Sequence, residues 1–191
     1  MRHDARYGTA VGLLDLIFAG EPAEKVLTNW ARSNRYAGSK DRAAVRDIVF
    51  DALRGKNFYQ ALARATDARG TLLGQVISSG QDPETVFTGM THSPDALSDE
   101  ERAVVAAEEA QQEPVYDVPG WLVDHLKESL GADFDRTMTA LRDRAPVDLR
   151  VNLLKSRVAE AARRLADDGV QTEPLRIAPH GLRVTEGERK V

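Results

Sequence analysis

The fold is decided by the segment Ser39-Lys-Asp-Arg-Ala-Ala-Val-Arg-Asp-Ile-Val-Phe-Asp-Ala-Leu-Arg54, which Gly55 follows. Serine is a preferred helix N-cap, and glycine is favoured just past a helix C-terminus. Between these two residues the apolar side chains recur at the spacing of one helical face. The sequence therefore predicts a helix from Ser39 to Arg54 whose buried face consists of Val45, Ile48, Val49, Ala52 and Leu53.

The same helical period extends to both sides of this segment. It predicts helices at residues 5–19, 22–30, 57–67, 70–79 and 98–110. Gly20 and Pro22 separate the first two, and Ser98 with Glu101 forms a capping-box pattern that opens the last. We therefore predict a mainly α-helical domain over residues 1–113.

Prolines and glycines then divide the chain into shorter pieces. Pro119-Gly120 precedes an amphipathic helix that Gly131 ends, and a short helix with Phe134 and Met138 follows. We interpret residues 114–145 as a linker unit of helices. Trp30 and Trp121 both fall on apolar helical stripes, so we expect them to be buried rather than to stack on bases.

After residue 146 the period changes from helix to strand. Val147, Leu149, Val151 and Leu153 alternate with polar residues, which is typical of a half-buried strand. Ser156 is then the expected cap of a helix that Gly169 ends, and strands are predicted at 170–177 and 181–185. We interpret residues 146–191 as an incomplete α/β domain, and we expect the sequence to be the front part of a longer protein.

Composition limits the classes of function. The chain has no cysteine, which excludes disulfides, thiolate zinc sites and cysteine nucleophiles within it. No stretch approaches the 18 apolar residues of a membrane helix and no signal peptide is visible, so we expect a cytoplasmic protein without membrane contact.

Charge is unevenly distributed along the chain. Residues 1–70 carry 12 Lys and Arg against 8 Asp and Glu, a net charge of +4. Residues 71–145 carry 5 against 15, a net charge of −10, and residues 146–191 carry 9 against 7, a net charge of +2. We expect an anionic partner such as RNA to contact the first and last thirds and to be repelled by the middle.

The sequence offers no catalytic centre. Its four histidines stand apart, without the spacing of a metal site, and no glycine-rich loop has the strand-loop-helix context of a phosphate or cofactor site. We therefore assign no catalytic, cofactor-binding or metal-binding residue to this chain.

Two groups of polar residues are candidates for RNA contact. The first is basic, and the second is a pair expected to share one face of a strand. Two other interpretations of the first group stay open. Its side chains could form a solvent-exposed helix face, or its arginines could pair locally with Asp41, Asp47 and Asp51. The candidates are Arg32, Arg35, Lys40, Arg42, Arg46 and Arg54 in the first group, and Arg150 and Asn152 in the second.

Three blocks of sequence each resemble a part of one known protein family, and they occur in the same order as in that family. The segment from Gly38 to Arg54 resembles the signature helix of NusB-like domains fused to bacterial RNA cytosine-5 methyltransferases of the Sun, Fmu or RsmB type. Pro119-Gly-Trp-Leu-Val-Asp-His-Leu126 resembles the linker helix of that family. The third block, Ala145-Pro-Val-Asp-Leu-Arg-Val-Asn-Leu-Leu-Lys155 with Ala178-Pro-His-Gly-Leu182, resembles the start of its methyltransferase part.

The resemblance implies a NusB-like bundle that binds ribosomal RNA, then a small RRM-like or ferredoxin-like region. It also implies an S-adenosylmethionine-binding catalytic domain with two cysteines. Neither those cysteines nor the cofactor loop occurs in this sequence, so the enzyme's chemistry transfers to none of its residues. The alternative is a free-standing NusB-type antitermination module that binds a transcript or a protein. Continuation of the reading frame past Val191 into a Pro-Cys pair would distinguish the two. Weak self-association stays open.

Overall fold

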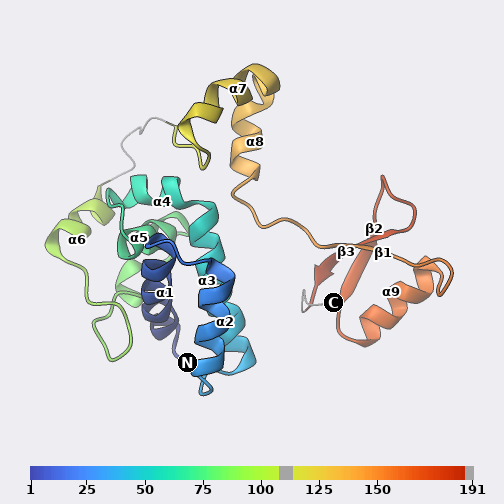
Figure 1. The fold of residues 1–191 in the computed structure, drawn as a ribbon, viewed down its shortest axis with the longest axis horizontal. Coiled ribbons are helices and arrows are strands. Elements are labelled where there is room, and N and C mark those ends of the chain that lie inside the picture. Colours follow the sequence, from blue (N-terminus) through green and yellow to red (C-terminus); the bar gives the residue numbers. More distant parts are fainter. Residues whose placement is uncertain (108–113, 188–191) are drawn as a thin grey trace. The chain divides into compact units, whose positions relative to one another are not determined.

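The computed structural model describes residues 1–107 and 114–187. The chain forms two compact units, Met1–Arg142 and Asp143–Val191, which are considered separately below. The first unit is helical and the second contains a three-stranded sheet (Figure 1). A mainly helical chain with a small α/β part is therefore confirmed.

The first unit is a bundle in which α5 is the central helix. Leu72, Leu73 and Val76 of α5 are fully buried, and the core around them includes Leu14 of α1 and Val49 of α3. Each such side chain contributes about 1.5–3 kcal/mol through burial. The helical elements are α1 His3–Phe18, α2 Ala23–Ser33, α3 Ser39–Arg54, α4 Lys56–Ala63, α5 Ala68–Ser78, η1 Pro83–Thr85, α6 Asp99–Ala106, α7 Gly120–Leu130, η2 Gly131–Asp133 and α8 Phe134–Ala140.

The tightest helix contact lies between α4 and α5. A Cβ atom at Gly74 would lie 1.9 Å from the carbonyl oxygen of Tyr59, so only glycine lets the two backbones approach this closely. Tyr59 and Gln75 both donate hydrogen bonds to Asp51, which ties the pair of helices to α3. The burial of Tyr59 and the nearby Asp51 carboxylate raise the pKa of the Tyr59 hydroxyl to about 12.

The structure corrects the predicted N-cap of α3, the predicted C-terminus of α4 and the predicted burial of Trp121. The Ser98–Glu101 capping box opens α6, whose expected last residues, 108–110, lie outside the described residues. Ser39 is not the cap of α3, because the carbonyl of Gly38 already accepts the first helical hydrogen bond, from Arg42. The helix expected at 57–67 ends at Ala63, since Arg64 adopts a left-handed conformation. Trp121, expected in the core, is 73% exposed, because no other described element covers that face of α7.

The segment around α7 and α8 is fastened to the bundle by Asp117. One carboxylate oxygen of Asp117 accepts the backbone N–H groups of Asn57 (2.8 Å) and Phe58 (3.1 Å), so it caps the N-terminus of α4 from a distant part of the chain. The other oxygen accepts Arg142 Nε at 2.8 Å. The Arg142 guanidinium also lies 4.0 Å from the ring centre of Phe58. Hydrogen bonds and an ion pair of Asp117 therefore connect the α7–α8 segment to α4 of the bundle.

We predict that Asp117→Ala lowers the free energy of unfolding by about 1–3 kcal/mol, because it leaves two helix N–H groups and a half-buried Arg142 without partners. Urea unfolding followed by far-UV circular dichroism measures the loss. Asp124→Ala is the control, since Asp124 is exposed on α7 and has no hydrogen-bond partner for its side chain among the described residues. Equal stability of the two variants would contradict the capping role.

The second unit is an antiparallel sheet with one helix. Its elements are β1 Asp148–Arg150, α9 Val158–Asp167, β2 Gln171–Pro174 and β3 Gly181–Glu186. The strand order is β1-β3-β2, so β3 is the central strand and pairs Leu182 with Leu149 of β1. Leu182 and Val184 are buried, and α9 packs against β2 and β3. The two strands expected after the helix are confirmed.

Two local predictions for this unit are wrong. The first strand ends at Arg150, so the alternation does not continue to Leu153, which is half exposed. The chain turns instead, and the carbonyl of Asn152 accepts hydrogen bonds from the N–H groups of Lys155 and Ser156. Ser156 lies in that turn and does not cap α9, whose N-cap is Arg157.

Candidate nucleic-acid interface

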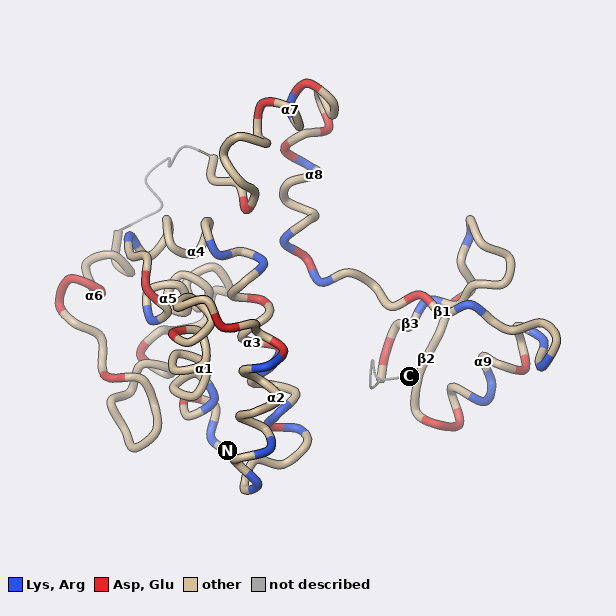
Figure 2. Tube along the Cα trace, in the orientation of Figure 1, with Lys and Arg blue, Asp and Glu red and all other residues tan. Residues whose placement is uncertain are grey.

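The basic group of the first unit occupies the end of α2, the following turn and the start of α3. Lys and Arg positions recur along these elements (Figure 2). Arg32 lies in the last turn of α2, and Arg35 lies in the connecting turn. Lys40, Arg42 and Arg46 lie on the first two turns of α3. We call these five residues the basic cluster.

The turn that carries the cluster is held by its own backbone and by one buried methyl group. The side-chain amide of Asn34 donates to the carbonyl of Trp30 at the end of α2, and the N–H of Ala37 donates to the carbonyl of Asn34. Ala37 is buried, while Arg35 and Tyr36 on its other side are exposed. The turn therefore presents long side chains to solvent from a fixed backbone.

The basic cluster has no acidic partner in the described part of the chain. Asp41 is occupied by Arg6, at 2.8 Å, and by the amino group of Met1. Asp51 is occupied by Arg54, Tyr59 and Gln75. Arg42 and Arg46 are partly buried, and Arg42 Nε is buried without a hydrogen-bond partner. Local pairing with Asp41 or Asp51, one alternative for the first group, is therefore wrong for Arg42 and Arg46.

Arg54 differs from the five residues of the cluster. Its guanidinium pairs with Asp51 at 3.1 Å and donates to the backbone carbonyl of Arg142 at 3.3 Å. These contacts satisfy part of its donor capacity within the first unit. The structure thus separates Arg54 from the other cations with which the sequence grouped it.

The candidates of the second unit, Arg150 and Asn152, do not share a strand face. Arg150 is exposed at the end of β1, whereas Asn152 lies in the turn, where its side-chain oxygen accepts the N–H of Leu154. The prediction that both point from one face of the strand is wrong, because the strand has already ended.

Arg150 instead belongs to a basic end of the sheet. The N–H of Val151 donates to the carbonyl of His180 at 2.8 Å, which brings the β1–α9 connection beside the β2–β3 loop. Lys and Arg positions lie in both segments (Figure 2). Leu154 and Ile177, at 98% and 96% exposure, lie in the same two segments. We call Arg150, Lys155, Arg157 and Arg176 the basic end; none pairs with an acid within residues 143–187.

Aromatic side chains distinguish the two units. No Phe, Tyr or Trp follows Phe134 in the sequence, so the second unit lacks the Phe and Tyr rings on which RRM domains stack bases. In the first unit Tyr36 is 74% exposed between Arg35 and the start of α3. Sequence reasoning missed Tyr36. The available signal was an aromatic residue within a basic turn rather than on a helical apolar stripe.

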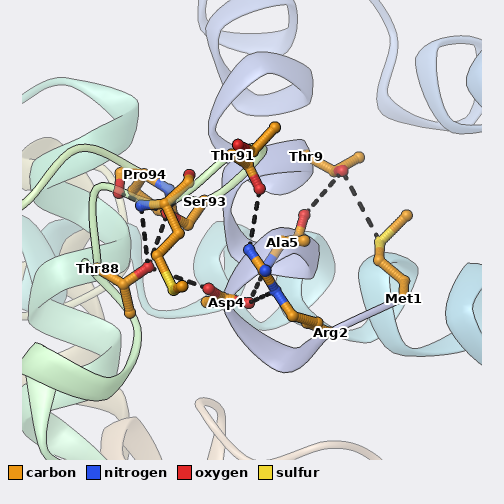
Figure 3. A network of polar contacts seen from close by, with 10 residues as sticks. Met1, Arg2, Asp4, Ala5, Thr9, Thr88, Thr91, Ser93 and Pro94 are labelled. Carbon is orange, nitrogen blue, oxygen red and sulfur yellow. Dashed lines mark hydrogen bonds and ion pairs between the residues drawn. The ribbon is translucent and has the colours of Figure 1, made fainter.

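A buried carboxylate ties the start of α1 to residues 88–94 (Figure 3). The Asp4 carboxylate accepts hydrogen bonds from the Thr88 hydroxyl (3.0 Å), from the backbone N–H of Ala5 (2.8 Å) and from Arg2 Nε (3.2 Å). Arg2 also donates to the carbonyl of Thr91. Burial alone would raise the pKa of Asp4, but the hydrogen bonds from Thr88, Ala5 and Arg2 outweigh it and lower that pKa.

We predict that this carboxylate makes stability depend on acid pH. Because the folded-state pKa of Asp4 is depressed, its contribution is present above the unfolded value of about 4 and is lost as pH falls through the folded value. Asp4→Asn should unfold more easily at neutral pH and lose less further stability between about pH 5 and pH 2. Urea unfolding across that range tests it; parallel curves for the two proteins would contradict the prediction.

The comparisons with known proteins concern the second half of the chain most directly. Residues 118–189 match the family model described as Methyltr_RsmF/B-like, ferredoxin-like domain. That match relates this part of the chain to RNA methyltransferases of the RsmF/RsmB type. It begins at α7 and so spans the boundary between the two compact units. No match was found among curated proteins.

A solved structure has a similar fold over nearly the whole chain. It is titled "Crystal Structure of PH0851", and it is 14% identical, with a TM-score of 0.56. The similarity covers 99% of this chain and 50% of that one, so this chain spans about half the length of that structure. At this identity the similarity shows the fold alone.

The described residues contain neither a metal-binding group of side chains nor a membrane-spanning helix. No group of three or more His, Asp or Glu side chains with metal-binding geometry occurs in residues 1–107 and 114–187. None of the helices described there is long and apolar enough to cross a membrane. The sheet within residues 143–187 is antiparallel throughout, with strand order β1-β3-β2.

Proposed function

We propose that this chain is the RNA-binding front part of an S-adenosylmethionine-dependent ribosomal RNA cytosine-5 methyltransferase, with a NusB-like helical bundle over residues 1–113. One observation carries the RNA-binding role: five cations gather on one turn and its flanking helices without an acid to neutralise them. The RsmF/B-like match of residues 118–189 supports the connection with a methyltransferase.

Unpaired cations on a rigid turn suit phosphate binding. Lys and Arg that replace the counterions of RNA supply affinity that does not depend on sequence. Arginine forks also bind phosphate oxygens through two parallel hydrogen bonds. Because Asp41 and Asp51 are engaged elsewhere, binding RNA breaks no ion pair of the basic cluster. Ribosomal RNA is proposed as the partner from the RsmF/B-like match.

The basic end of the second unit offers a further phosphate-binding surface. Three of its four cations lie in the β1–α9 region, and the fourth, Arg176, lies in the β2–β3 loop, which the sheet brings to the same end. The central ion pair of the sheet, Arg183 with Asp148, lies at 2.8 Å and is satisfied internally. RNA contact is therefore proposed for the basic end rather than for the whole sheet.

Catalysis is assigned to no residue of this chain. Methyl transfer would need a cofactor site and a nucleophile, and this sequence contains no cysteine. The chain's proposed contribution is affinity and orientation: it would hold RNA through its phosphates. Which cytosine is modified is a property of the whole enzyme.

We predict that Arg42→Ala with Arg46→Ala weakens RNA binding about tenfold at low salt. Two lost phosphate contacts should also reduce the slope of log affinity against log salt concentration by up to about two units. The loss should be similar for RNAs of different sequence, because phosphates carry no sequence information. Fluorescence anisotropy with labelled RNA over a salt series measures both quantities.

The matched control is Arg102→Ala with Arg136→Ala. It removes the same two charges, but these arginines pair with Glu84 and Asp133 outside the basic cluster. The control should keep most of the affinity. If both double variants lose affinity equally, net charge rather than the basic cluster governs binding, and the proposed site is wrong.

A separate pair of substitutions tests the second unit. Arg157→Ala with Arg176→Ala should weaken binding and reduce the salt slope as the first pair does, provided that the RNA is long enough to reach both units. The same Arg102 and Arg136 control applies. Unchanged affinity for long RNA would restrict the interface to the basic cluster of the first unit.

A further inference from the structure

We propose that the cleft beside Tyr36 binds an unpaired nucleobase of the RNA whose phosphates lie on the basic cluster. This inference rests on the proposed RNA-binding function and adds a ligand class and a site. The cleft has a volume of about 680 Å³ and is lined by Met1, Thr9, Tyr36, His92, Pro94 and Asp95, among others. That size lies within the usual range for sites that bind small organic groups.

Tyr36 supplies a surface on which a base can stack. Its side chain is 74% exposed, while its neighbour Ala37 is buried and anchors the turn. A large aromatic ring left in water on a fixed backbone loses little conformational entropy when it binds a planar ligand. Every nucleobase has such a planar face, whereas duplex RNA keeps its faces covered by stacking.

Charge decides which part of a nucleotide enters the cleft. Arg69 lines it, but its guanidinium is engaged by Glu101 at 2.7 Å and by the backbone carbonyls of Asp95 and Ala96. The Asp95 side chain has no hydrogen-bond partner among the described residues. The Asp95 carboxylate interacts electrostatically with Arg69, but its oxygens remain able to accept N–H groups of a base, whereas a phosphodiester has no N–H or O–H group to donate to them. The phosphates therefore lie outside the cleft, on the side of Arg35 and the start of α3.

Backbone contact and hydrogen bonds hold the part of the cleft that residues 92–95 line. A Cβ atom at Gly8 of α1 would lie 2.1 Å from the carbonyl oxygen of His92, so helix and loop are in direct backbone contact. The Asp4, Thr88 and Ser93 hydrogen bonds hold the same loop (Figure 3). A cleft with one fixed wall and one exposed ring needs little rearrangement to bind a base.

The experiment compares Tyr36→Ala with Trp121→Ala on a single-stranded RNA that contains 2-aminopurine and on a duplex of the same length. Trp121 is the matched control, because its 73% exposure is close to the 74% of Tyr36, while its segment, residues 114–142, is acidic. Tyr36→Ala should weaken binding of the single strand about tenfold and leave the salt slope unchanged, since no phosphate contact is lost. Tyr36→Phe should keep the affinity, and 2-aminopurine fluorescence should be quenched on binding only when residue 36 is aromatic.

The outcomes separate this inference from the proposed function. If Tyr36→Ala binds single strand and duplex as tightly as the unmodified chain does, the cleft does not take a base and the inference fails, while the function of the basic cluster stands. Equal losses for Tyr36→Ala and Trp121→Ala would also overturn it. If the unmodified chain binds neither RNA, the proposed function itself is wrong.

Discussion

The burial of α5 is the constraint on which the first unit depends. Leu72, Leu73 and Val76 lose all contact with water only when α1, α3 and α4 surround them, so one helix determines where the others lie. Once α3 packs through Val45 and Val49, its opposite flank faces outward. Burial of Val45 and Val49 thus sets the orientation of α3 and with it the positions of Lys40, Arg42 and Arg46.

The pairing of acids then decides which cations are available. Asp41, Asp51 and Glu101 bind Arg6, Arg54 and Arg69, respectively, and each pair joins structural elements or stabilises one. Among the described residues, the cations of the α2–α3 turn and start of α3 and those of the basic end of the sheet have no acidic partner. A net charge of −4 conceals this arrangement, because most of the excess acid lies in residues 71–145.

The α7–α8 segment contacts the helical bundle but belongs to the same family match as the sheet. Asp117 and Arg142 fasten it to α4 by capping, pairing and contact with Phe58, which explains why it belongs to the first compact unit. The RsmF/B-like match nevertheless begins at residue 118 and includes it with the sheet. Contact density and family similarity therefore divide the chain at different points. The predicted boundaries at residues 113 and 145 stay a prediction, as does the NusB-like character of the bundle.

The sequence by itself determined the elements whose signals are local. Apolar spacing, the Ser98–Glu101 capping box and the glycines after Arg54 and Leu130 were sufficient for α3, α6 and α7. Alternation predicted β1 but not its end at Arg150. Local physics sets these features, because each depends on neighbours within one or two turns. Only the tertiary structure decided that Trp121 is exposed, that Arg54 also reaches the carbonyl of Arg142 and that Arg42 Nε is buried without a partner. It also placed Tyr36 beside a cleft formed with residues 92–95. Such properties depend on which distant segment covers a side chain, and the spacing of residues along one segment carries no information about that partner.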